Sequence, residues 1–209
     1  MGKLKELLES TDYLILDGAL GTELENRGHD VSGKLWSAKY LLENPQIIQE
    51  LHEDYLRSGA DIVTTSSYQA TVQGLEDYGL SEKEALDTIA LTVELAKNAR
   101  QNFWQYLSDD EKKKRVYPLI AGDVGPYAAY LADGSEYTGD YQLSKESFKD
   151  FHRSRIQTLL AAGSDFLAIE TIPNMTEATA LVELLADEFP DTEAYMSFTA
   201  QDSQSISDG

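Results

Sequence analysis

Five short apolar segments, separated by stretches of helical periodicity, limit most strongly what this 209-residue chain can fold into. Each segment is four or five residues long and is flanked by polar or turn-forming residues, as expected for buried strands. Short apolar strands that alternate with helices predict a parallel α/β sheet. The expected strands are 13–16, 61–65, 117–121, 166–169 and 194–198.

The segments between the strands carry recognisable helix end signals. Asn44 followed by Pro45 is typical of a helix start, and Gly59 is typical of its end. Ser81 with Glu84 predicts a capping box at the start of a long helix. The expected helices are 45–58, 81–106, 144–162 and 175–189.

Two parallel architectures fit this alternation, the doubly wound sheet and the (β/α)8 barrel. No G-x-G-x-x-G motif follows the first expected strand, which disfavours the dinucleotide-binding doubly wound fold. Five βα units are too few to close a barrel, which needs about eight, and no helix follows the last strand. We therefore expect residues 1–209 to form one domain, the N-terminal portion of a barrel truncated after about five to six strands. A complete open five-stranded sheet is the alternative.

The charge and cysteine content narrow the classes of partner and chemistry. The net charge of −20 disfavours nucleic acid and anionic membrane surfaces as partners. No apolar run is long enough to cross a membrane and no signal-type segment follows Met1, so we expect a cytoplasmic protein. The absence of cysteine rules out disulfides, a thiolate nucleophile and cysteine metal ligands within these residues. We also find no three-ligand metal spacing.

Two acidic residues, Asp17 and Glu170, each end an apolar segment. Active sites of barrels lie at the carboxyl ends of the strands, where these residues are expected. Asp17 precedes a glycine turn and could equally be a turn or capping residue, whereas glutamate is not favoured there. From spacing alone, the pair could be a glycosidase acid pair, a metal clamp or anchors for a cationic amine. The other strand ends are 65–68, 122–126 and Thr199.

Other aromatic and histidine residues give weaker signals. Trp36 follows a loop and is equally compatible with packing. Four tyrosines lie in the long loop 127–141, and long loops are usually functional or disordered. His52 and His152 lie within expected helices, where surface or hydrogen-bonded roles are commoner than metal binding.

Four long segments resemble the homocysteine S-methyltransferases, in particular the bacterial enzymes that use S-methylmethionine or S-adenosylmethionine. The resemblance runs in order through most of the chain, from about residue 13 to 209. The segments are LDGALGTELENRG, LWSAKYLLENPQIIQELHEDYLRSGADIVTTSSYQAT, GDVGPYAAYLADGSEYTGDY and AIETIPNMTEATAL.

The resemblance implies a (β/α)8 barrel that binds zinc and makes methionine. Homocysteine would bind zinc as a thiolate and attack the methyl group of a sulfonium donor. A free thiol has a pKa of about 8.5, so a metal is a direct way to obtain the thiolate at neutral pH. An acid-rich mouth would attract the cationic donor.

The resemblance also implies substrate-binding residues. Asp17 and Glu170 would hold homocysteine, with Glu170 near its amino group. The Gly18–Ala19 turn would let the backbone approach the substrate, and Trp36 and Tyr68 would face a cationic donor. We identify no catalytic residue within these 209 residues.

The absence of cysteine departs from the family pattern. The family holds zinc with three cysteines, one after the sixth strand and an adjacent pair near the C-terminus, and these would lie beyond Gly209. The first hypothesis is therefore a methyltransferase represented by part of its chain. The second is a metal-free, non-catalytic fragment that self-associates through an open barrel edge, and the third is a hydrolase using Asp17 and Glu170. The methyl donor, and the use of selenohomocysteine, stay open.

Overall fold

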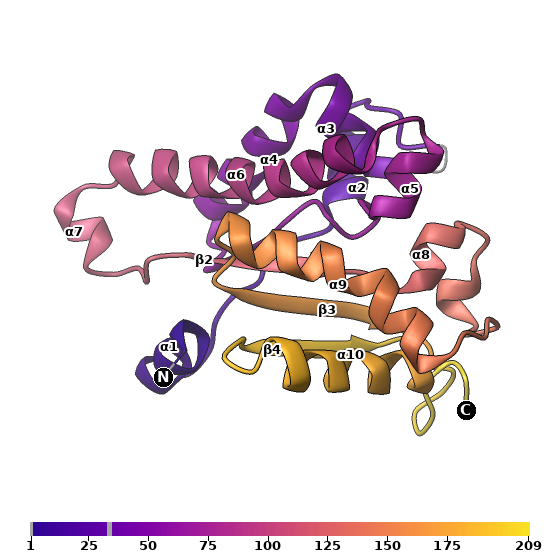
Figure 1. The fold of residues 1–209 in the computed structure, drawn as a ribbon. Helices are drawn as coiled ribbons and strands as arrows, with labels where there is room; N and C mark the ends of the chain where they lie inside the picture. Colours follow the sequence, from indigo (N-terminus) through magenta and orange to yellow (C-terminus); the bar gives the residue numbers. More distant parts are fainter. Residues whose placement is uncertain (1, 33–34) are drawn as a thin grey trace.

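The computed structural model describes residues 2–32 and 35–209. It contains one parallel sheet of four strands in the order β1-β2-β3-β4, so that strands adjacent in sequence are adjacent in space (Figure 1). This is the simple progression of a barrel wall. The strands are β1 (Ile62–Thr64), β2 (Leu119–Val124), β3 (Phe166–Ile172) and β4 (Ala194–Phe198).

The first expected strand is reduced to a single bridge between Leu16 and Ile62. Asp17 donates its N–H to the carbonyl of Ile62 at 3.0 Å, which continues the parallel pairing for one residue. Tyr13 and Leu16 are 70% and 47% exposed, so their side chains pack little against the rest of the protein. The segment also has a strand neighbour, β1, on one side only. The prediction of a regular strand at 13–16 is therefore wrong. Strand 194–198 is confirmed, and β2 and β3 each extend three residues past their expected ends.

The four long helices form where the end signals predict them. The capping box of α6 (Glu82–Tyr106) is present, and Gly59 and Gly163 end α4 (Pro45–Ser58) and α9 (Lys145–Ala162) at positive φ. The fourth is α10 (Met175–Glu188). The shorter helices are α1 (Lys3–Ser10), α2 (Leu20–Asn26), η1 (Trp36–Lys39), α3 (Tyr40–Glu43), α5 (Val72–Asp77), α7 (Asp109–Lys112), α8 (Tyr127–Leu131) and η2 (Ser135–Tyr137).

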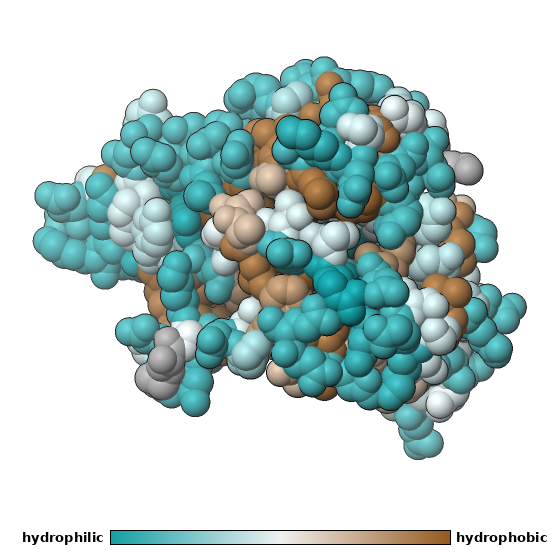
Figure 2. All heavy atoms as spheres, viewed as in Figure 1, coloured by the Kyte–Doolittle hydropathy of each residue, from teal (hydrophilic) through white to brown (hydrophobic). Residues whose placement is uncertain are grey.

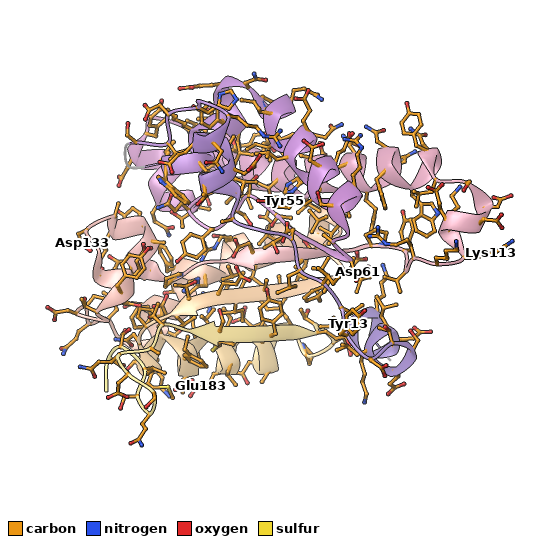
Figure 3. The ribbon with its side chains drawn as sticks, turned by 180° about the vertical axis from the view of Figure 1, so that it is seen from behind. Tyr13, Tyr55, Asp61, Lys113, Asp133 and Glu183 are labelled. Atoms are coloured by element: carbon orange, nitrogen blue, oxygen red, sulfur yellow. The ribbon has the colours of Figure 1, made fainter. Side chains whose placement is uncertain are left out.

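The two faces of the sheet have different surroundings. On the outer face, side chains such as Val63, Ile120 and Leu167 pack against the helices in the main core. The inner face carries a smaller cluster, formed by Ile62, Leu119, Ala121, Phe166 and Ala168, and Figure 3 shows its strands uncovered by the large helices. A doubly wound sheet has helices on both faces, so this arrangement favours the barrel wall.

Helix α1 closes the amino end of this inner face. Its Leu4 and Leu7 pack against the inner cluster, and Lys3 pairs with Asp165 at 2.5 Å. The Leu4 N–H donates to the Glu193 carboxylate at 2.9 Å, just before β4. Because α1 covers the amino end, the carboxyl end of the inner face is left for a site.

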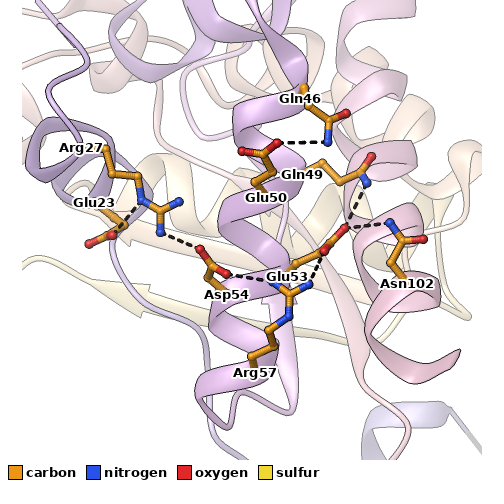
Figure 4. Close-up of polar contacts among 9 residues, drawn as sticks. All are labelled: Glu23, Arg27, Gln46, Gln49, Glu50, Glu53, Asp54, Arg57 and Asn102. Atoms are coloured by element: carbon orange, nitrogen blue, oxygen red, sulfur yellow. Dashed lines mark hydrogen bonds and ion pairs between the residues drawn. The ribbon is translucent and has the colours of Figure 1, made fainter. Parts of the chain in front are cut away.

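Ion pairs and a hydrogen bond connect α2, α4 and α6 at the surface. Arg27 contacts Glu23 and Asp54, each at 2.9 Å, and Asn102 of α6 donates to Glu53 of α4 at 2.8 Å (Figure 4). Hydrophilic side chains cover most of the helical surface, with apolar side chains visible between them (Figure 2). Among the described residues, no helix is long and apolar enough to cross a membrane.

Candidate functional site

A cavity of about 810 Å³ opens at the carboxyl ends of β1, β2 and β3. Its wall combines strand ends with the turn before α2, helix η1, the loop after β1 and the loop around η2. All six residues that the resemblance implies line this one cavity. They are Asp17, Gly18, Ala19, Trp36, Tyr68 and Glu170.

Asp17 is held in one orientation by β1. Its Oδ2 accepts the Thr64 N–H and its Oδ1 accepts the Thr64 hydroxyl, both at 2.9 Å. Burial raises the pKa of Asp17 to about 6, with a smaller contribution from the charge of Glu170, while the Thr64 hydrogen bonds act in the opposite direction. Asp17 is therefore a fixed carboxylate that is ionised at neutral pH and neutral in moderate acid.

Glu170 reaches the cavity from the inner face of β3. Its Oε1 accepts a hydrogen bond from the Tyr195 hydroxyl of β4. Burial raises the pKa of Tyr195 above its usual range, and Glu170 adds to the effect, so the phenol stays a donor. Sequence reasoning missed Tyr195 because it reads as an ordinary aromatic residue of a strand.

Asp123 is a further carboxyl group in the cavity wall. The sequence analysis placed it at a strand end but assigned it no role. It lies in β2 opposite Ala168 and is only 6% exposed. Burial raises its pKa well above the usual range; the charges of Glu170 and Asp17 act in the same direction and Arg155 opposes them. Alternation along β2 places Asp123 on the same face as Leu119 and Ala121. That signal could have found it if the strand had been expected to continue past residue 121.

Two aromatic residues of the cavity, Trp36 and Tyr68, lie against glycines. A Cβ at Gly21 would lie 2.2 Å from the Trp36 ring, and one at Gly125 would lie 2.6 Å from the Tyr68 carbonyl oxygen. A side chain larger than hydrogen at either position would therefore displace an aromatic residue of the site.

Backbone strain also gathers at this cavity. Trp36, Ala132 and Thr171 are the described non-glycine residues with positive φ, at 45°, 53° and 63°, and all three line the cavity. Such conformations cost free energy and are typical of functional sites.

A buried carboxylate, Glu177, organises the helices behind the site. It accepts the Tyr127 N–H at 2.6 Å, a hydrogen bond from the Tyr141 hydroxyl, and one from His152 Nε2 at 2.7 Å. Burial raises the pKa of Tyr141, and the Glu177 charge adds to this. Of the four tyrosines in loop 127–141, Tyr127 and Tyr141 thus have structural roles. Tyr130 donates a hydrogen bond to Asp77, and Tyr137 lines the cavity.

Arg155 connects this network to the loops of the cavity. It donates to His152 Nδ1 at 2.8 Å and to the carbonyl oxygens of Tyr68 and Gly125. Because a guanidinium only donates, His152 Nδ1 must accept and Nε2 must carry the proton. Burial lowers the pKa of His152, consistent with a neutral ring. His152 therefore has a hydrogen-bonded structural role, while the rings of both His152 and His52 are fully buried rather than at the surface.

Zinc, which the resemblance implies, does not fit the residues present. The sequence contains no cysteine, and residues 2–32 and 35–209 contain no group of three or more histidine, aspartate and glutamate side chains able to hold a metal ion. The cavity carboxyl groups, which belong to Asp17, Asp123, Glu136 and Glu170, are therefore better suited to an organic cation than to a metal.

Sequence comparison relates the chain to known methyltransferases. The family described as Homocysteine S-methyltransferase matches residues 14–209. A homocysteine S-methyltransferase of Bacillus subtilis (strain 168) is 47% identical over 209 residues, which cover 100% of this chain and 65% of the relative. One of Escherichia coli (strain K12) is 50% identical over 206 residues, which cover 99% of this chain and 64% of the relative. The chain thus spans just under two thirds of the length of these curated relatives.

Structural comparison agrees with the sequence match. The metallated form of the homocysteine methyltransferase MmuM from Escherichia coli superposes with a TM-score of 0.91 at 50% identity, covering 99% of this chain and 69% of that one. The apo form superposes with a TM-score of 0.77 at 42% identity, covering 99% and 66%. The expected fold class, the α/β barrel, is confirmed by this match to a barrel enzyme.

Proposed function

Because this chain belongs to the homocysteine S-methyltransferase family, we propose that it serves the transfer of a methyl group from a sulfonium compound to the sulfur of homocysteine, giving methionine. The observation that carries the proposal is the convergence of Asp17 and Glu170 in one cavity at the carboxyl ends of the strands. The proposed donor is S-methylmethionine or S-adenosylmethionine.

The two carboxylates suit the amino group of homocysteine. An ammonium group has only donors to offer, and a carboxylate only acceptors, so their hydrogen bonds are charge-assisted. Asp17 is held by Thr64, and Glu170 by Tyr195, so both are oriented before the substrate arrives. The exposed Gly18–Ala19 turn leaves room beside Asp17 for the rest of the amino acid.

The aromatic side chains of the cavity suit the sulfonium methyl donor. Trp36 and Tyr68 line the same cavity, and aromatic faces attract a positive charge. In the transfer, an electron pair of the homocysteine thiolate, which has already lost its proton, forms a bond to the methyl carbon as the bond from that carbon to the sulfonium sulfur breaks. The bonding pair stays on the donor sulfur, which becomes a neutral thioether. The charge that held the donor is thereby lost, which favours product release.

We propose zinc as the metal of the whole enzyme, but the residues described here do not supply its ligands. When bound, zinc would keep the homocysteine sulfur as a thiolate. A cytoplasmic location likewise stays a prediction.

The alternative of a non-catalytic, self-associating fragment stays a prediction too. One observation favours it: within the described sheet, β4 pairs on one side only, and its Phe198 is 43% exposed. The hydrolase alternative has no support from the relatives described above. Analytical ultracentrifugation of the 209-residue chain tests self-association, and a monomer at micromolar concentration would contradict it.

Methionine formation from homocysteine and each donor tests the proposed function. The assay uses the protein at its natural length, with Glu170→Gln and, as a matched control, the exposed Asp191→Asn. We expect Glu170→Gln to raise the KM for homocysteine about tenfold or more, because a charge-assisted hydrogen bond is lost. The KM for the donor should change little. No methionine formation by the unmodified protein, or an unchanged KM for homocysteine in Glu170→Gln, would contradict the proposal.

A further inference from the structure

Asp123 is the buried group in the cavity to which the proposed reaction gives no task. It is 6% exposed, and its Oδ1 has no hydrogen-bond partner among the described residues. Nor does any lysine, arginine or histidine of the described residues lie within ion-pair distance of it. A buried carboxylate oxygen without a partner lowers the stability of the fold, so its presence calls for an explanation.

The local structure does not need the carboxyl group. The backbone of Asp123 is already fixed by a ring of hydrogen bonds: its N–H donates to Thr65 Oγ1 at 2.9 Å, and its carbonyl accepts the Ser67 hydroxyl at 2.7 Å. The two hydroxyls are 2.8 Å apart, and Thr65 must donate to Ser67, since Ser67 donates to the carbonyl. An asparagine or serine at position 123 would preserve this ring.

The position of Asp123 brings it together with the two carboxylates already assigned. Asp123 pairs with Ala168 across β2 and β3, and Glu170 lies two residues further along the same inner face. Asp17 lies beside Thr64 at the end of β1, on the other side of β2. All three carboxyl groups line the one cavity.

We propose that Asp123 is a specificity-determining residue, the third carboxylate that accepts a hydrogen bond from the ammonium group of the acceptor amino acid. An ammonium group has three N–H donors, and Asp17, Glu170 and Asp123 supply acceptors from three neighbouring strand ends. The inference rests on the proposed function, since it concerns the same substrate. It adds that Asp123 makes the site prefer a thiol that carries an α-amino group over a thiol acid without one.

The charges around Asp123 suit a positively charged ligand. The groups that face it are Asp17, Glu170 of β3, Arg155 of α9 and Tyr195 of β4. Burial and the two acids raise the pKa of Asp123 above its usual range, while Arg155 opposes them. A bound ammonium group would add a positive charge beside three acids, which favours their ionised forms.

The test compares two ligands that differ in the amine alone, homocysteine and 4-mercaptobutanoate. Their dissociation constants are measured by calorimetry for the natural-length protein and for Asp123→Asn, with Asp191→Asn as the matched control. We expect Asp123→Asn to weaken homocysteine binding about tenfold or more and to leave the affinity for 4-mercaptobutanoate unchanged or higher. If Asp123→Asn fails to fold, Asp123→Ser tests the same point.

Two results would overturn the inference: unchanged homocysteine affinity, or equal weakening of both ligands. Glu170→Gln is measured in parallel to separate this inference from the proposed function. If Glu170→Gln loses selectivity for homocysteine and Asp123→Asn does not, the inference on Asp123 fails and the proposed function stands. If the unmodified protein itself shows no preference for homocysteine, both fail.

Discussion

Glu177 and Asp123 are both buried carboxyl groups, yet their surroundings differ completely. Glu177, on the helical side of the sheet, accepts hydrogen bonds from Tyr127, Tyr141 and His152. Asp123, on the inner face, keeps an oxygen with no partner among the described residues. The first carboxylate is fully used by the protein, while the second is left open toward a cavity.

The difference separates an acid that maintains the fold from one available for a ligand. Removing one member of a satisfied buried polar network leaves its partners unpaired, which is costly. Removing the charge of an unsatisfied acid relieves a cost instead. Removal of a buried carboxylate should therefore lower the stability of the fold at Glu177 but not at Asp123.

The largest expected effect is on stability at Glu177. We expect Glu177→Ala to lower the free energy of unfolding by roughly 3–5 kcal/mol, because His152, Tyr127 and Tyr141 lose their common acceptor. Asp123→Asn should lower it by less than about 1 kcal/mol, or raise it. Urea unfolding of both variants measures the contrast, and equal losses would break the comparison.

A second effect concerns His52, which is buried without a partner but away from the cavity. Burial lowers its pKa from 6.5 to about 4, so the unfolded chain binds more protons between these values. The free energy of unfolding is therefore highest, as far as His52 is concerned, above pH 6.5. It decreases as the pH falls toward 4, by about 3 kcal/mol at most.

The His52→Leu variant isolates this contribution. Its stability should fall less than that of the unmodified protein between pH 6.5 and 4, measured by unfolding at fixed pH values. Asp17 acts in the opposite direction, because its raised pKa makes stability decrease as the pH rises from about 4 to about 6. The measurement is therefore best made in an Asp17→Asn background. Parallel pH profiles with and without His52→Leu would show that His52 does not titrate as described.

A third effect is the pH dependence of homocysteine binding. The pKa of Asp17 is about 6, so this carboxylate is largely neutral at pH 5. We expect the affinity for homocysteine to fall about tenfold between pH 7 and pH 5, since each unit below the pKa removes about tenfold of the ionised form. The Asp17→Asn variant should bind more weakly at pH 7 and show a flatter profile. A steep profile that persists in Asp17→Asn would assign the titration to another group.

The smallest effect is expected at Gly21, beneath Trp36. A methyl group there would displace the Trp36 ring. We expect Gly21→Ala to raise the KM for the sulfonium donor about two- to fivefold, the size of an exposed cation–π contact. The KM for homocysteine serves as the internal control and should not change. A change confined to homocysteine would place Trp36 on the acceptor side of the cavity.

Much of the fold could be predicted from the sequence because its signals are local. The capping box at Ser81 and Glu84 and the apolar run of β4 depend on neighbouring residues only. The segment 13–16 has the composition of a strand, but it pairs with β1 alone and is exposed, so it forms a single bridge. Pairing partners are not encoded within the segment itself.

The cavity was predicted less completely than the fold, for the same reason. Asp17 and Glu170 end apolar runs and could be recognised. Asp123 follows Gly122, which is typical of a turn, although β2 continues through both residues because they pair with Leu167 and Ala168 of β3. Tyr195 gains its role only from the position of Glu170 across the sheet. Groups defined by contacts between strands need the structure.

The proposed function depends above all on recognition of the homocysteine amino group by the acidic cavity. The most direct measurement is the ratio of the dissociation constants of 4-mercaptobutanoate and homocysteine for the natural-length protein at pH 7.5. We expect a preference for homocysteine of about tenfold or more, from at least one charge-assisted hydrogen bond, and a loss of that preference in Glu170→Gln. Equal affinity for the two ligands would contradict the account.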